Sequence, residues 1–150
     1  MKALFDQVSL KASKMVTNAY STSFSLGIRM LNESVREPVY AIYGFVRFAD
    51  EIVDSFEGYD KAALIADFRK QTDEAIDQRI SLNPILNSFQ HAVNHCSIDQ
   101  WLIDAFFDSM EMDLEEQTYD QATFEKYILG SAQVVGLMCL RVFCNGDNMQ

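Results

Sequence analysis

The chain has 150 residues, enough for one domain, and 49% of them are hydrophobic, which excludes a disordered chain. Twelve basic and 22 acidic residues give a formal net charge of −10. A chain this acidic is not expected to bind the phosphates of a nucleic acid. We therefore predict no nucleic-acid partner.

The start of the chain, MKALFDQVSLKASK, is polar and mixed, unlike a signal peptide. The three cysteines are an odd, small number, which together with that start favours a reduced, cytoplasmic setting without disulfides. The longest apolar run, Val134–Leu140, is far shorter than the roughly 20 residues of a membrane span. A peripheral contact with a membrane remains open.

Hydrophobic periodicity is helical along almost the whole chain, and no stretch alternates as a β-strand does. The predicted helices cover residues 4–18, 35–55, 60–80, 84–95, 98–117 and 121–144. Both prolines, Pro38 and Pro84, are expected where a helix begins. Residues that resemble N-caps stand before four of the helices: Asp60, Asn83, Ser97 and Asp120. Residues 1–150 are therefore predicted to form one all-α domain of antiparallel helices.

The predicted helix 35–55 carries an unusual polar stripe. Steps of three and four residues place the following side chains on one face: Tyr40, Tyr43, Arg47, Asp50 and Asp54. The opposite stripe is apolar: Ile42, Phe45, Val46, Ala49, Val53 and Phe56. Because apolar residues also surround the polar stripe, we expect a helix buried on both sides. A buried polar stripe is costly unless it lines a cavity or binds a ligand.

Asp50 and Asp54 are one turn apart, and Glu51 lies beside them. Neighbouring carboxylates repel unless a cation joins them, and Mg²⁺ is held by one or two carboxylates together with substrate phosphates. Arg47, one turn earlier, suits a diphosphate or the Asp50 carboxylate. The spacing is equally compatible with a solvent-exposed charge ladder of Arg47, Asp50 and Asp54 that has only a structural role.

The segment YAIYGFVRFADEIVDS resembles the first aspartate-rich segment of the phytoene and squalene synthase family, with bacterial phytoene synthases as the nearest type. The matching residues are Tyr43, Arg47, Asp50, Glu51 and Asp54. Upstream, Ser21-Thr22-Ser23-Phe24 resembles a family loop that touches a diphosphate, and Tyr20 stands where the family usually has histidine.

A third match lies in the last predicted helix, which resembles the family's tyrosine helix. The residues kept there are Tyr127, Ala132, Val135 and Gly136, whereas Leu129 and Gln133 depart from the pattern. The family's second aspartate-rich motif has no match. The resemblance therefore implies an all-α bundle of the isoprenoid synthase type, truncated to the first half of the fold.

The resemblance implies Mg²⁺-dependent head-to-head condensation of two prenyl diphosphates, geranylgeranyl diphosphate to phytoene, in carotenoid or terpenoid biosynthesis. It assigns Mg²⁺, or Mn²⁺ in its place, to Asp50, Glu51 and Asp54. It implies that diphosphate oxygens contact Arg47, Ser21 and Ser23, and that the allylic cation faces Tyr43 and Phe24. Near the reacting carbons it places Tyr127, and along the prenyl tunnel Ala132, Val135 and Gly136. Without the second motif the chain alone is expected to be inactive.

Two alternatives remain. A non-catalytic helical module is the first, because the strongly apolar last helix could bind a partner or a second copy, which predicts a homo-oligomer. A relative of the head-to-tail prenyl synthases is the second, although their D-D-x-x-D motif is only approximated by Asp50–Asp54.

The pair His91 and His95 lacks the glutamate of a zinc-protease motif and is interpreted as structural. A further acidic stripe is interpreted as solvent-exposed: Asp104, Asp108, Glu111 and Glu115.

Overall fold

A computed structural model describes residues 2–114 and 133–148. Every regular element in these residues is a helix, so the predicted all-α class is confirmed. The helices are α1 (Lys2–Tyr20), α2 (Thr22–Arg29), α3 (Glu33–Ser55), α4 (Lys61–Gln78), α5 (Pro84–Cys96), α6 (Gln100–Leu114) and α8 (Val134–Asn148). Among them, none combines the length and the hydrophobicity that a membrane crossing requires.

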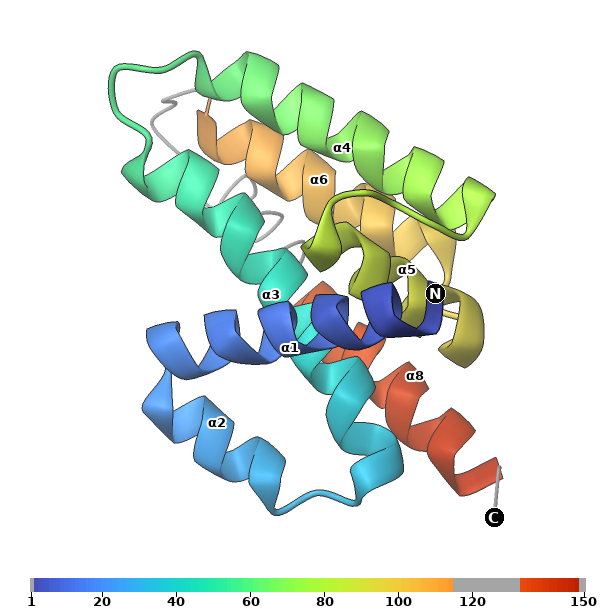
Figure 1. Cartoon of the computed structure of the whole chain (residues 1–150). Coiled ribbons are helices and arrows are strands. Elements are labelled where there is room, and N and C mark those ends of the chain that lie inside the picture. Colours follow the sequence, from blue (N-terminus) through green and yellow to red (C-terminus); the bar gives the residue numbers. More distant parts are fainter. Residues whose placement is uncertain (1, 115–132, 149–150) are drawn as a thin grey trace.

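Helix α3 lies at the centre of the fold and packs against α1, α4, α5, α6 and α8. Figure 1 shows α1 crossing α3, with α4 and α6 side by side. The core is organised around Phe45 of α3, whose ring is fully buried and stacks on Phe89 of α5 at a centroid distance of 3.8 Å. Rings from α4 and α6 complete this aromatic cluster: Phe68, Phe106 and Phe107.

Helix α1 packs on α3 and α5 through small hydroxyl residues. Ser9, Ser13 and Thr17 are fully buried and line the inner face of α1. A Cβ atom added to Gly44 of α3 would lie 3.2 Å from the Cα, Cβ and Oγ atoms of Ser13. The hydroxyl groups of Ser13 and Ser88 share a hydrogen bond of 2.6 Å. The absence of large side chains here lets the two helices approach closely.

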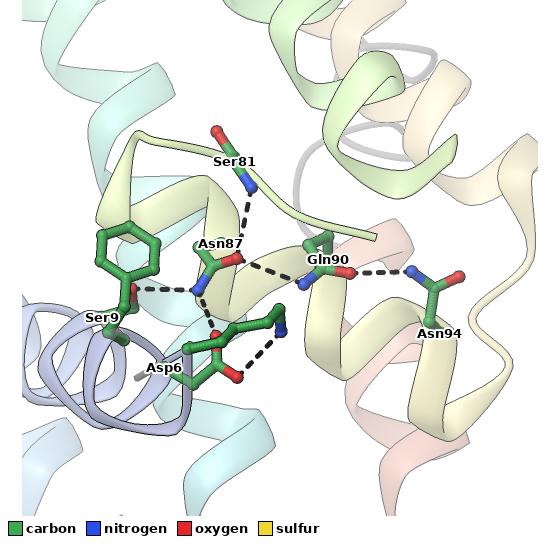
Figure 2. A network of polar contacts seen from close by, with 8 residues as sticks. Asp6, Ser9, Ser81, Asn87, Gln90 and Asn94 are labelled. Carbon is green, nitrogen blue, oxygen red and sulfur yellow. Dashed lines mark hydrogen bonds and ion pairs between the residues drawn. The ribbon is translucent and has the colours of Figure 1, made fainter. Parts of the chain in front are cut away.

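A buried polar network joins α1 to α5, as Figure 2 shows. The amide of Asn87, which is 1% exposed, donates hydrogen bonds to Asp6 at 2.8 Å and to the Ser9 hydroxyl at 3.1 Å. Its amide oxygen accepts from the Ser81 backbone and from Gln90. The Asn87 hydrogen bond is the main reason why the pKa of Asp6 is lowered. A buried amide with such complete partners costs little and fixes how the two helices pack.

The structure corrects some local predictions and confirms others. Residues Thr22–Arg29, taken in part as a linker, form α2. Pro38 lies inside α3, which begins five residues earlier at Glu33 with Asn32 as its N-cap. The caps Asp60 and Asn83 are confirmed, as is Pro84 in the first turn of α5. Ser97 is instead the left-handed C-cap of α5, with φ of 56°, and Asp120 lies outside the described residues.

We predict that Gly44→Ala destabilises the chain. Helix propensity favours alanine by up to about 1 kcal/mol, but the new methyl group would press on the Ser13 backbone, and overpacking costs about 1–3 kcal/mol. The matched control is Gly27→Ala in α2, where an added Cβ meets no atom within 4 Å. In urea unfolding, Gly44→Ala should lower the midpoint and Gly27→Ala should keep or raise it. Equal midpoints for the two variants would contradict the close packing of α1 and α3.

Candidate active site

One face of the second half of α3 groups an arginine with three carboxylates. The Arg47 guanidinium hydrogen-bonds Glu51 at 3.1 Å and lies 3.9 Å from the carboxylates of Asp50 and Asp54. The Arg47 side chain is 22% exposed and that of Asp54 is 61% exposed, so the group opens to solvent toward the end of α3. The charge ladder that the spacing left open is present, with Glu51 as its closest member. Because one guanidinium faces three carboxylates, the group as a whole is anionic.

Tyr20, the last residue of α1, completes this group from a second helix. Its ring centroid lies 4.9 Å from the Arg47 guanidinium, and its hydroxyl donates a hydrogen bond to the Glu51 carboxylate. That bond raises the pKa of Tyr20. The pKa of Glu51 is lowered, chiefly by a hydrogen bond from Ser55 and then by those from Tyr20 and Arg47. Sequence reasoning assigned Tyr20 no role, because the contact depends on how α1 crosses α3.

The site has a donor that could bind an anion and carboxylates that could bind a cation. Arg47 Nε is buried and has no hydrogen-bond partner in the described part of the chain. Asp50 and Asp54 converge on the guanidinium, a cation that lies where a metal ion could bind. Within residues 2–114 and 133–148, no three His, Cys, Asp or Glu side chains are placed to hold a metal by themselves. Mg²⁺ can also be held by two carboxylates together with substrate phosphates, and a metal role for Asp50 and Asp54 stays a prediction.

The predicted polar stripe of α3 is only partly correct. Tyr40 is 2% exposed and belongs to the core, and the Lys14 ammonium lies 5.8 Å from its ring centroid. Tyr43 is half-buried, one turn before Arg47. Ser21 joins α1 to α2, and its backbone N–H donates to the Thr17 carbonyl at 3.0 Å. The side chains of Ser23 and Phe24 lie outside the described residues, although both belong to α2.

Only some of the site residues predicted in the last helix lie in the described part of the chain. Tyr127 and Ala132 lie outside the described residues. Val135 is half-buried in α8, which packs against α3. Gly136 is exposed and has open space where a side chain would be. The structure therefore brings Tyr20, Arg47 and the three carboxylates together, and the tunnel residues remain a prediction.

The acidic stripe on α6 is exposed, as expected, but it is also paired. Arg69 of α4 lies 3.0 Å from Asp108, 3.1 Å from Glu111 and 3.7 Å from Asp104. Its guanidinium also covers the Phe107 ring at 5.6 Å. This group therefore joins α4 to α6. Glu115 lies outside the described residues.

A cavity of about 480 Å³ lies between α1, α3 and α5, away from the carboxylate group. Asp6, Glu37 and the stacked rings of His91 and His95 lie on its wall. None of the predicted site residues lines this cavity. We therefore base the candidate site on the charge geometry of α3.

Glu51→Gln should make folding less sensitive to acid. The pKa of Glu51 is lowered from 4.5, so its ionised form stabilises the fold above that pH, and this contribution is lost as pH falls through the folded-state pKa. The free energy of unfolding from urea titrations should therefore change less between pH 7 and about pH 3 in Glu51→Gln than in the parent. The control is Glu74→Gln, an exposed position on α4. If the free energy of unfolding of Glu51→Gln changes with pH as much as that of the parent, the hydrogen bonds to Glu51 do not lower its pKa in the folded chain.

Three comparisons with known proteins bear on this site. A family model described as squalene/phytoene synthase matches residues 17–150. The presqualene diphosphate synthase of Zymomonas mobilis is 31% identical, over 97% of this chain and 50% of the relative. The enzymes of the same name from Sinorhizobium fredii and Rhodopseudomonas palustris are 32% and 29% identical, over 85% and 83% of this chain. The chain spans about half the length of the curated relatives it matches.

A solved structure of a dehydrosqualene synthase with a ligand superposes with a TM-score of 0.80, over 91% of this chain and 48% of that chain. Its sequence identity is 20%, so the likeness concerns the fold. The family match contains all the motif residues, from Ser21 to Gly136, on which the resemblance was based. The chain therefore belongs to the squalene/phytoene synthase family.

Proposed function

We propose that this chain provides the diphosphate-ionising part of a synthase that joins two prenyl diphosphates head to head. The main support is the group around Arg47, in which three carboxylates converge on the guanidinium and its buried Nε donor has no partner among the described residues. Family membership supports the reaction class. The family's second aspartate-rich motif has no match in this chain, so we expect the chain alone not to turn over substrate.

Arg47 is proposed to bind the diphosphate of the ionising substrate, with help from the hydroxyl groups of Ser21 and Ser23. A planar guanidinium suits two phosphate oxygens at once. Asp50 and Asp54, assisted by Glu51, would hold Mg²⁺ or Mn²⁺. The bound ion supplies positive charge that neutralises the departing diphosphate. On this proposal Arg47 exchanges carboxylate partners for phosphate oxygens when the substrate binds.

The carbon side of the reaction needs a dry, aromatic environment, because water would capture the allylic cation. Tyr43 and Phe24 are proposed to face this cation, since aromatic rings attract positive charge. Tyr127 is proposed to lie near the reacting carbons. The prenyl tunnel is proposed to be lined by the small residues Ala132 and Gly136, together with Val135. The half-buried position of Tyr43 beside Arg47 supports this arrangement.

The relatives change the expected product. Phytoene was expected from the motifs, whereas all three relatives are presqualene diphosphate synthases. We therefore propose presqualene diphosphate, formed from two fifteen-carbon prenyl diphosphates. Two diphosphates enter and the product keeps one. One diphosphate and one proton leave, and two new carbon–carbon bonds close the cyclopropane ring that joins the halves. Phytoene formation from twenty-carbon substrates by the complete enzyme would contradict this choice.

The binding prediction uses a prenyl thiodiphosphate, which does not ionise readily. Calorimetry should show binding that requires Mg²⁺ and is lost in the double variant Asp50→Asn/Asp54→Asn. In Arg47→Lys the affinity should fall about tenfold or more, because a point charge replaces a donor that can bind two oxygens at once. The control is Asp67→Asn, an exposed carboxylate on α4 that accepts a hydrogen bond from Gln71 of the same helix. Unchanged affinity in both site variants would support the purely structural charge ladder.

The second proposal, self-association, rests on α8. Three large side chains on this helix are more than a third exposed: Leu137, Leu140 and Phe143. Exposed apolar patches drive association, and a twofold dimer is the commonest closed form. Sedimentation equilibrium should give about twice the chain mass of 17.1 kDa, and Leu140→Glu should return it to the monomer. A monomer at tens of micromolar in the parent would contradict the proposal.

We assign the reaction to the cytoplasm, with the cysteines as support. In the described part of the chain, Cys96, Cys139 and Cys144 form no disulfide. Burial raises the pKa of Cys139 to about 11 and also raises that of Cys96, so both thiols stay protonated at neutral pH. Protonated, buried thiols are poor metal ligands and poor partners for disulfide exchange.

A further inference from the structure

Helix α1 exposes several large apolar side chains, although Ala12 and Val16 of the same helix pack against the core. Its fully buried face consists of Ser9, Ser13 and Thr17, whereas its outer face exposes large apolar side chains. Leu4 is 61% exposed, Val8 49% and Met15 67%. Helices of globular proteins normally bury their apolar stripe and solvate the polar one. The outer stripe of α1 is thus apolar without serving the core.

Basic residues accompany this stripe. The steps from Leu4 to Val8, Lys11 and Met15 are four, three and four, so Lys11 lies on the same face as the three apolar residues. Up to Leu31 the chain has four basic residues and one carboxylate, a net charge of +3. The rest of the chain therefore carries −13, since the total is −10. The apolar stripe thus lies in a basic region of an acidic chain.

Helix α2, which follows α1 along the chain and contacts it, adds exposed apolar side chains (Figure 1). Leu26 is 54% exposed, and Met30 just after the helix is 88% exposed. Arg29, at the end of α2, is also exposed. The Arg36 guanidinium donates to the carbonyl oxygens of Arg29 and Leu31, which holds the end of α2 against α3. We call the α1–α2 face the surface formed by Leu4, Val8, Lys11, Met15, Leu26, Arg29 and Met30.

We propose that the α1–α2 face docks on the surface of an anionic lipid bilayer. Lysine and arginine next to large apolar side chains on a surface helix are the combination that binds in the headgroup region, where the apolar groups enter the acyl boundary. Free phosphate would use the cations alone and leave the apolar residues without a partner. A second copy meeting this face with its own would bring two basic surfaces together. Anionic lipid matches both the charge and the apolar stripe.

The test is flotation of the 150-residue chain with vesicles, without prenyl diphosphate or Mg²⁺, so that it is independent of the proposed reaction. At 0.15 M salt the chain should float with vesicles containing phosphatidylglycerol, and not with pure phosphatidylcholine. Binding should fall in 1 M salt, because the basic contacts are screened. The variant Lys11→Gln/Arg29→Gln should bind about 25-fold more weakly, at about fivefold for each charge lost.

The apolar half of the α1–α2 face is tested by Leu4→Ser/Met15→Ser. Both side chains are exposed, so the variant should keep its melting temperature while losing vesicle binding. The control pair is Ile80→Ser/Leu82→Ser, two exposed positions outside this face and outside α8, which should bind as the parent does. Equal flotation of all variants, flotation with neutral vesicles, or no flotation of the folded parent would each overturn the proposal. Loss of a dimer in Leu4→Ser/Met15→Ser would overturn it too, by showing that a second copy covers the face.

Discussion

The close approach of α1 to α3 at Ser13 and Gly44 determines much of what the other residues can do. With a larger residue at either position the two helices would separate, because an added Cβ at Gly44 already lies 3.2 Å from Ser13. Two turns further along α1, this approach places the Tyr20 ring over Arg47. Because the small hydroxyl residues of α1 face inward, the apolar side chains on the opposite side, Leu4, Val8 and Met15, face outward. One packing contact thus shapes both the charged group and the α1–α2 face.

Arg47 makes the carboxylate group stable in the absence of ligand. Three carboxylates on adjacent turns repel one another, and a guanidinium within 3.1–3.9 Å of all three relieves that repulsion. A structural charge ladder and a ligand site are therefore compatible descriptions of the same residues. In the ligand-free chain the arginine is the counter-ion. On the proposed function, a substrate that brings a metal ion and a phosphate would give the carboxylates the metal ion and Arg47 the phosphate as new partners. No charge would then be left unpaired.

The sequence was sufficient to predict what depends on local spacing. The period of the segment 38–55 indicated one helix and placed Arg47 near Asp50 and Asp54, because neighbours three and four residues apart share a face in any α-helix. The family motifs, which are also local, indicated the fold. Tyr20 was missed because its contact with Arg47 joins residues 27 positions apart through tertiary packing. Helix α2 was missed in part because serine, threonine and glycine make up half of its eight residues, and these residues have weak helix propensity.

Helix α1 shows why periodicity alone can assign the wrong face. Its position and length were predicted almost correctly, yet its fully buried residues are Ser9, Ser13 and Thr17, and three of its large apolar side chains are exposed. Net charge misleads in the same way, since a total of −10 suggests repulsion from any anionic surface. At physiological salt, however, charges act over about 8 Å, so a surface responds to the residues that face it rather than to the whole chain. The acidic group on α3 and the basic α1–α2 face can therefore attract opposite charges independently, as long as the small inner face of α1 keeps its basic and apolar residues turned outward.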